Sequence, residues 1–268
     1  MMRKILLPLI LIIVFFGIML LSIVLPNPKT ELVLYINDVI EAEHDYFTDV
    51  VAQSVKSVVH VRCPQWQGSG FIIDKHIICT ARHVVEGVED FEITFKGWYE
   101  LCPEAKVVIN ATKAISDKEH DVGFIWIEEE IPDYMVAKIG SIKDCKLGQD
   151  IFIVGSPYGD INFNSVSKGI ISGLNRDWDE INSWTGERYG WEIAFTSDSA
   201  AHPGNSGGAV FTTDGIVRGI LVGGYSPVLN CSMPCDLFLP DIEYIKQMFI
   251  MDRYKIEPES VCIVTVED

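Results

Sequence analysis

Short apolar runs separated by polar breaks dominate the chain from residue 55 onward. The runs are rich in Val, Ile and Phe and end at Gly, Asp, Asn or Pro, which is the pattern of β-strands. Because no amphipathic helices alternate with them, the pattern favours an all-β sandwich or barrel over βαβ units. The expected strands are Val55–Arg62, Gly70–Ile73, Ile77–Thr80, Phe91–Phe95, Lys106–Asn110, Val122–Ile127, Asp150–Val154, Ser165–Ser172, Trp191–Thr196, Ala209–Phe211 and Val217–Val222.

Helical patterns flank this β body. Residues 29–54 predict a linker that leads into a short amphipathic helix. Near the other end, Pro240 stands at a helix start, and Asp241 and Glu243 lie in the first turn, where acidic residues are favoured. The apolar face of this closing helix comprises Ile242, Ile245, Met248 and Phe249.

Residues 5–25 form 21 consecutive positions without a charge. As a helix rising about 1.5 Å per residue, this stretch spans the roughly 30 Å of hydrocarbon in a bilayer. Arg3 and Lys4 precede it, so the positive-inside bias places the N-terminus in the cytoplasm and the rest of the chain outside. We therefore expect a single-pass anchor with the lipid bilayer as its partner. A cleaved signal peptide, which would make the protein secreted, is the alternative.

The chain is acidic, with 21 Lys and Arg against 38 Asp and Glu and a net charge of −17. Such a field repels phosphates, so nucleic acid is not an expected partner, and it favours solubility. The seven cysteines lack the paired spacing of structural zinc sites, so we expect no metal. Cys79 lies in an apolar run as a buried thiol, whereas Cys231 and Cys235 flank a turn and are candidates for a disulfide.

Ser206 stands in the glycine-rich stretch from Pro203 to Val210. Glycines permit positive φ angles and close backbone approach, so neighbouring N–H groups can turn toward one point beside the serine hydroxyl. That arrangement predicts a nucleophile with an oxyanion hole. The stretch also matches the G-x-S-x-G elbow of α/β-hydrolases, so the motif alone leaves two classes open.

The order of the histidines decides between them. An α/β-hydrolase needs its catalytic histidine after the serine, but the last histidine in this chain is His202. Upstream, His83 ends an apolar run, and Asp121 opens another, where its carboxylate could be buried against an imidazole. The deduced catalytic order is His83, Asp121, Ser206. His120 and Asp117 are the local rivals, but neither leads directly into a matching apolar strand.

Four blocks of sequence resemble the protease domain of the HtrA (DegP) family of chymotrypsin-like serine endopeptidases. They occur in the order typical of the family and cover roughly residues 55–250. The blocks are Gly68–Ile73 leading into Thr80–Gly87, Asp121–Ile125, the stretch Leu147–Asp150 with Val154–Gly159 and Lys168–Ser172, and Ser197–Gly208.

The resemblance implies two six-stranded antiparallel β-barrels with the triad between them and no cofactor. It also implies an oxyanion hole made by the N–H groups of Gly204 and Ser206, with Asn205 shaping the loop. Residues Ser156–Gly159 would lie in a loop that such enzymes use in activation or substrate contact. The S1 pocket should be uncharged and suit small or medium apolar side chains. Its lining residues would be Ala200, Leu221, Val222 and Gly223.

We therefore expect residues 1–28 to form the anchor, 29–54 the linker, 55–252 the protease domain and 253–268 a tail. No PDZ domain is expected, which leaves homo-oligomer formation open. The expected function is that of a membrane-anchored endopeptidase, acting on polypeptides in quality control or processing outside the cytoplasm. The alternative is a catalytically silent protease fold that binds other proteins.

Overall fold

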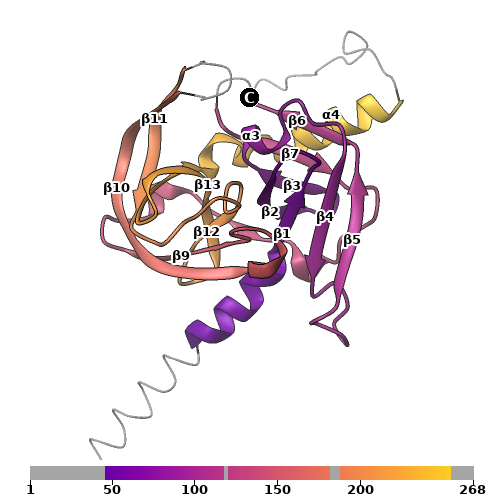
Figure 1. Ribbon diagram of the computed structural model, residues 1–268, viewed down its shortest axis with the longest axis horizontal. Helices are drawn as coiled ribbons and strands as arrows, with labels where there is room; N and C mark the ends of the chain where they lie inside the picture. The colour runs from indigo at the N-terminus through magenta and orange to yellow at the C-terminus, as the bar shows by residue number, and fades with distance from the viewer. Residues whose placement is uncertain (1–45, 118–119, 182–187, 255–268) are drawn as a thin grey trace, which may run out of the picture. The chain divides into compact units, whose positions relative to one another are not determined.

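Two β-sheets form the body of the protein (Figure 1). The structure, a computed structural model, describes residues 46–117, 120–181 and 188–254. Within these ranges the expectation of an all-β body is confirmed. The first sheet has the strand order β5-β4-β1-β2-β3-β7-β6. Its strands are β1 (Val58–Arg62), β2 (Gln67–Asp74), β3 (Ile77–Thr80), β4 (Phe91–Lys96), β5 (Lys106–Ala111), β6 (Lys113–Ser116) and β7 (Gly123–Trp126).

The second sheet closes on itself. Its order is β12-β9-β10-β11-β14-β13, and a β12–β13 pairing joins the two ends into a six-stranded barrel, as predicted. The short strand β8 (Lys138–Ile139) adds to β13 in parallel. The barrel strands are β9 (Asp150–Gly155), β10 (Ser165–Ile181), β11 (Arg188–Ser197), β12 (Ala209–Thr212), β13 (Ile216–Ser226) and β14 (Leu229–Pro234).

The first sheet differs from the six-stranded barrel that we expected. It has seven strands and the form of a half-barrel, and its two edge strands, β5 and β6, are consecutive in the chain. Only Thr112 separates them, so one segment pairs with β4 through its first half and with β7 through its second half. The physical reason for the difference is that, in the part of the chain that the structure describes, no hydrogen-bonded ladder joins the edge strands β5 and β6, which meet only through the chain at Thr112, whereas β12 and β13 supply such a ladder in the second sheet.

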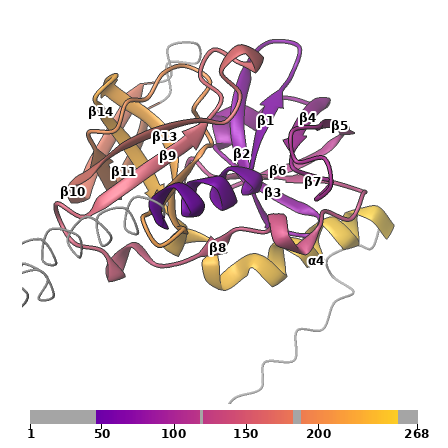
Figure 2. The ribbon, with the colours of Figure 1, turned by 90° about the horizontal axis from the view of Figure 1, so that it is seen from below.

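Short helical turns connect the strands, and the closing helix returns to the first sheet. Helix α4 (Ile242–Tyr254) lies beside that sheet (Figure 2). Its Phe249 ring packs on Trp126 of β7 at 5.5 Å, and Lys246 Nζ lies 3.1 Å from Asp74 Oδ2. The one-turn helix α3 (Arg82–Val85) follows β3. The 3-10 turns are η1 (Val55–Ser57), η2 (Asp133–Met135), η3 (Ile142–Asp144), η4 (Asp160–Asn162), η5 (Cys235–Leu237) and η6 (Leu239–Asp241).

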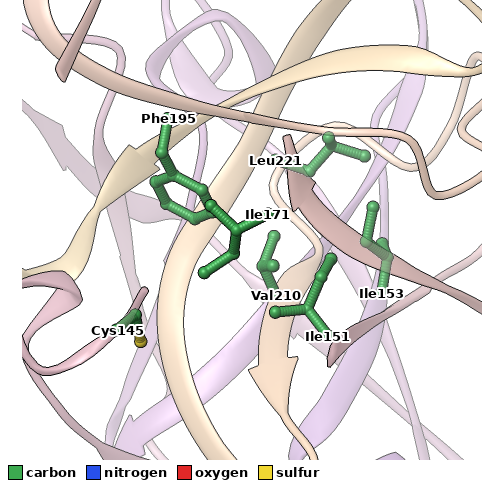
Figure 3. Packing of buried hydrophobic residues seen from close by; sticks show 7 residues of the cluster. All are labelled: Cys145, Ile151, Ile153, Ile171, Phe195, Val210 and Leu221. Carbon is green, nitrogen blue, oxygen red and sulfur yellow. The ribbon is translucent and has the colours of Figure 1, made fainter. Parts of the chain in front are cut away.

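The interior of the barrel is apolar and tightly packed. Side chains from β9, β10, β11, β12 and β13 meet there, and each is at most 7% exposed (Figure 3). Burying such side chains contributes roughly 1.5–3 kcal/mol each, so this cluster anchors the strands that lead into the loops described below. The cluster comprises Cys145, Ile151, Ile153, Ile171, Phe195, Val210 and Leu221.

The expected cysteine chemistry is partly corrected. Cys79 is a fully buried thiol, as predicted, but Cys235 is also a buried thiol and not half of a disulfide with Cys231. Burial raises the pKa of both thiols. The neighbouring Cys235 raises the pKa of Cys79 further, and the charge of Asp236 does the same for Cys235. The buried environment therefore favours the neutral thiol over the reactive thiolate.

The N-terminal predictions fall largely beyond the described residues. The predicted span over residues 5–25 and most of the 29–54 linker lie outside them, as does most of the predicted tail. Residues 46–54 are helical, where the short amphipathic helix was expected. Of the helices that the described ranges contain, none combines the length and the apolar character needed to span a bilayer.

Candidate active site

His83 and Asp121 meet at one end of the first sheet. Strands β3 and β7 pair antiparallel with Thr80 opposite Gly123, so the chain leaving β3 and the chain entering β7 lie side by side. His83 sits in helix α3, just after β3, and Asp121 lies two residues before β7. This pairing brings together two side chains that are 38 positions apart in the sequence.

The Asp121 carboxylate holds both the ring and the backbone of His83. Oδ2 lies 2.7 Å from Nδ1 of the ring, and Oδ1 accepts a 3.0 Å hydrogen bond from the backbone N–H of His83. Because an ionised carboxylate only accepts hydrogen bonds, Nδ1 carries the proton and Nε2 is left as the basic atom of the neutral ring. The Asp121 side chain is 5% exposed and that of His83 is 43% exposed, so the ring faces an accessible surface.

The charge state of Asp121 follows from its surroundings. Burial raises its pKa, but the positive charge of His83 and the two hydrogen bonds from His83 lower it, as does the nearby charge of Arg82. The lowering contributions prevail and hold the pKa of Asp121 below its ordinary value. Asp121 is therefore an anion at neutral pH, suited to orient an imidazole and to stabilise its protonated form.

The serine loop, residues 198–208 between β11 and β12, contacts both sheets. The backbone N–H of Ser69 in β2 donates to the Ser206 carbonyl at 2.7 Å, and the N–H of Gly207 donates to the Leu221 carbonyl of β13 at 2.7 Å. Gly207 has a φ of +84°, and a Cβ there would lie 2.1 Å from both the Ser69 carbonyl oxygen and Thr80 Oγ1. The loop thus packs against the end of β3, three residues before His83.

The turn before Ser206 orients two backbone amides. Pro203 and Gly204 are the central residues of a turn closed by the Asn205 N–H on the His202 carbonyl at 3.0 Å. Gly204 has a φ of +99°, which identifies a type II turn, where glycine is required at the second central position. Among the described residues, the N–H groups of Gly204 and Ser206 donate no hydrogen bond, so neither is engaged by another group there.

A second loop fixes the peptide between Pro203 and Gly204. The Tyr158 N–H donates to the Pro203 carbonyl at 2.8 Å. In a trans peptide the carbonyl and the following N–H point in opposite directions, so this bond turns the Gly204 N–H away from Tyr158. Ser69 adds a further restraint, because its hydroxyl donates to the Gly204 carbonyl at 2.7 Å and accepts from the Ser156 N–H at 2.9 Å.

Sequence reasoning assigned no role to Ser69 or to the Tyr158 amide. Ser69 stands between Gly68 and Gly70, so the same glycine-flanked pattern that drew attention to Ser206 was a usable signal. The contact between Tyr158 and Pro203 joins separate loops through backbone atoms. No pattern of side chains in the sequence could have predicted it.

In the sequence, one of the expected S1 residues precedes Ser206 and three follow it. Ala200 is exposed, and its carbonyl accepts a hydrogen bond from the Ser167 hydroxyl at 2.7 Å. The backbone of Leu221 lies directly beside the loop, but its side chain belongs to the barrel core, and Val222 is buried at 3% exposure. Gly223 is partly exposed. None of the four carries a charge.

The rival pair has similar geometry in a different setting. His120 Nδ1 lies 2.7 Å from Asp117 Oδ2, the same distance as in the His83–Asp121 pair. The Asp117 side chain is 33% exposed, in contrast to the buried Asp121. The serine loop packs against the residues that lead into His83, so position and burial both favour the His83–Asp121 pair. Among the described residues, no three His, Cys, Asp or Glu side chains converge as a metal site would.

Two packed sheets of mainly antiparallel strands, one of them a closed barrel, define the class of chymotrypsin-fold proteins when a His–Asp pair and a serine in a glycine-rich loop meet between them. The sequence profile of the trypsin-like peptidase domain matches residues 68–220. The chain belongs to the trypsin-like peptidase family.

Within that family its relatives are Do-like and DegP-like proteases. Protease Do-like 1, chloroplastic, of Arabidopsis thaliana is 33% identical over 185 residues, which are 68% of this chain and 39% of that protein. A probable periplasmic serine endoprotease DegP-like of Halomonas elongata is 34% identical over 177 residues, 63% of this chain and 33% of that protein. The chain therefore spans well under half the length of these curated relatives.

A solved structure has a similar fold. The crystal structure of Deg5 superposes with a TM-score of 0.60 and 23% identity, and the match covers 76% of this chain and 95% of that one. At this level of identity the likeness establishes the chymotrypsin-like fold, with one closed six-stranded barrel.

Proposed function

We propose that the protein is a serine endopeptidase in which Ser206 is the nucleophile, His83 the general base and Asp121 the residue that orients His83. The observation that carries the proposal is the double contact of Asp121 with the ring and the backbone N–H of His83. This contact fixes the tautomer and the direction of the imidazole, and the serine loop packs against the residues that precede the same helix.

In the proposed acylation step, Ser206 Oγ attacks the carbonyl carbon of a peptide bond while Nε2 of His83 accepts the hydroxyl proton. The carbonyl π electrons move to oxygen, and the N–H groups of Gly204 and Ser206 bind the resulting oxyanion. Each such donor contributes roughly 3–4 kcal/mol to transition-state stabilisation in comparable enzymes. The protonated His83 then donates its proton to the leaving amine as the C–N bond breaks.

In the proposed deacylation step, water replaces the amine. His83 accepts a proton from this water as its oxygen attacks the acyl carbon, and then returns a proton to Ser206 Oγ as the ester bond breaks. The same oxyanion hole serves both steps. His83, Ser206 and the two backbone N–H donors thus suffice for the proposed catalytic cycle.

The proposal is tested with a fluorophosphonate probe, which reacts only with activated hydroxyl groups. We expect the probe to label the wild-type protein on Ser206, with the modified residue located by mass spectrometry of the tryptic peptides. A wild-type protein that stays unlabelled in the presence of unfolded protein and membranes would favour the catalytically silent alternative. Labelling at another serine would overturn the assignment of the nucleophile.

We further propose that residues 5–25 anchor the chain in a membrane, with the protease domain outside the cytoplasm. The basic residues Arg3 and Lys4 before an uncharged apolar stretch support this orientation, as do relatives whose names describe them as periplasmic. We expect the full chain to stay in the membrane fraction after alkaline carbonate extraction, and the chain without residues 5–25 to be released. Release of the full chain would contradict the anchor.

A further inference from the structure

The loop that joins β9 to β10 holds a strained conformation. It runs from Ser156 to Asn164, and Tyr158 and Asn164 both have positive φ angles, of 59° and 54°. A tyrosine in the left-handed region costs free energy, so the surrounding contacts must impose this conformation. Its backbone N–H is the group that donates to the Pro203 carbonyl, so whatever holds the loop also affects the serine loop.

A buried histidine of the first sheet contacts this loop. His60 lies in β1 and is 1% exposed. Its Nδ1 is 3.3 Å from Asp160 Oδ1, and its Nε2 is 3.2 Å from Gln67 Oε1. An acceptor oxygen thus lies against each ring nitrogen of His60, and its contact with Asp160 is a close polar contact at ion-pair distance. The Gln67 side chain in turn packs directly on Gly159, so the two residues that follow Tyr158 are both restrained by β1 and β2.

Two further groups complete the surroundings of His60. Lys106 Nζ lies 3.9 Å from Asp160 Oδ1 and 4.8 Å from the centre of the Phe163 ring, and Phe163 meets the His60 ring edge-on at 6.5 Å. The Asp160 side chain is 57% exposed, so its ion pair with Lys106 is a weak surface pair. The other close partner of Asp160 is the His60 ring, which is buried in β1 and so offers a fixed contact.

We infer that His60 and Asp160 are positioning residues for the proposed oxyanion hole. The contacts run from His60 to Asp160, along the loop to the Tyr158 N–H, and from there to the Pro203 carbonyl. Since the carbonyl fixes the opposite direction of the Gly204 N–H, loss of the His60–Asp160 contact loosens an oxyanion donor without touching the triad. This inference rests on the proposed serine endopeptidase function.

The test is kinetic and uses Asp160→Ala with Asp150→Ala as its matched control. Asp150 also carries a half-exposed carboxylate, 2.8 Å from Lys168 Nζ, but it contacts no part of the 156–164 loop. We expect Asp160→Ala to lower kcat about tenfold with little change in KM, because an oxyanion donor acts on the transition state. The rate of fluorophosphonate labelling should fall to a similar extent, and Asp160→Asn should recover part of it, since asparagine has the same size and keeps an oxygen that can face His60 Nδ1.

Hydrogen exchange separates failure of the inference from failure of the proposed function. In a Ser206→Ala background, Asp160→Ala should increase deuterium uptake in the peptide covering residues 203–208, and Asp150→Ala should not. If Asp160→Ala and Asp150→Ala have the same labelling rate and the same deuterium uptake, the inference is overturned while the endopeptidase proposal stands. If the wild type is never labelled, the proposed function fails and exchange alone decides: increased uptake supports the coupling and unchanged uptake overturns it.

Discussion

Ser206→Ala is expected to lower kcat for peptide hydrolysis on the order of a millionfold, and His83→Ala by a similar factor. The two residues act as one unit, since the hydroxyl is a poor nucleophile without a base to accept its proton. The double variant should therefore lose no more than either single variant. Steady-state kinetics on an unfolded protein substrate, with circular dichroism to show that each variant folds, provide the measurement.

His120→Ala is the matched control for this first expectation. It removes an imidazole that lies as close to an aspartate as His83 does, from a pair whose aspartate is more exposed than Asp121. We expect its kcat to stay within a few-fold of the wild type. A loss in His120→Ala that equals the loss in His83→Ala would contradict the assignment of the general base.

Asp121→Asn should give the second large effect, a fall in kcat of about ten-thousandfold at neutral pH, as for the aspartate of other serine proteases. An asparagine of the same size fills the space, but its NH₂ group donates where the carboxylate accepts. His83 is then held in the wrong tautomer, with Nε2 protonated and unable to take the proton of Ser206. Normal kinetics in this variant would show that Asp121 does not orient the base.

The same variant has a predictable effect on stability. The pKa of Asp121 is lowered in the folded protein, so its carboxylate stabilises the fold above the unfolded value of about 3.9, and this contribution is lost as pH falls through the folded pKa. Urea titrations should show wild type more stable than Asp121→Asn at pH 7. The difference in the free energy of unfolding should shrink on acidification toward pH 3, and a difference that grew instead would contradict the lowered pKa.

The closeness of His83 and Asp121 could be predicted because it depends on strand periodicity. The residues Ile77–Thr80 match β3 in both bounds, and the strand expected at Val122–Ile127 contains β7. Each candidate stands at the end of an apolar run, where a side chain leaves the sheet. Once the two strands are neighbours, antiparallel pairing brings these ends together.

Other parts of the fold had no sequence signal of this kind. Strand β14 (Leu229–Pro234) was missed because Asn and Pro are depleted in strands and the segment lacks β-branched and aromatic residues, although it pairs with β11 and β13 and is buried from Asn230 on. Its strand conformation is imposed by its neighbours. The division of one segment between β4 and β7 at Thr112 was likewise unpredictable, since it depends on contacts with both neighbours.

The candidate site shows the same limit. Glycines around Ser206 predicted a sharp loop with free amides, and the turn at Pro203 and Gly204 has that form. The contact that directs the Gly204 amide comes from Tyr158, and the bonds that hold Tyr158 come from β1 and β2. Contacts between distant backbone atoms leave no periodic trace in a sequence. They emerge only once the two sheets are packed together.

The division of the candidate site between the sheets has a consequence for how the protein is made. His83 and Asp121 belong to the first sheet, whereas Ser206 lies on a loop between two strands of the second. Synthesis proceeds from the N-terminus, so the first sheet emerges from the ribosome while the nucleophile is still untranslated. On the proposed roles, an unfinished chain holds a base without a nucleophile. On these roles, the nascent chain cannot cleave itself or other proteins until its second sheet has folded.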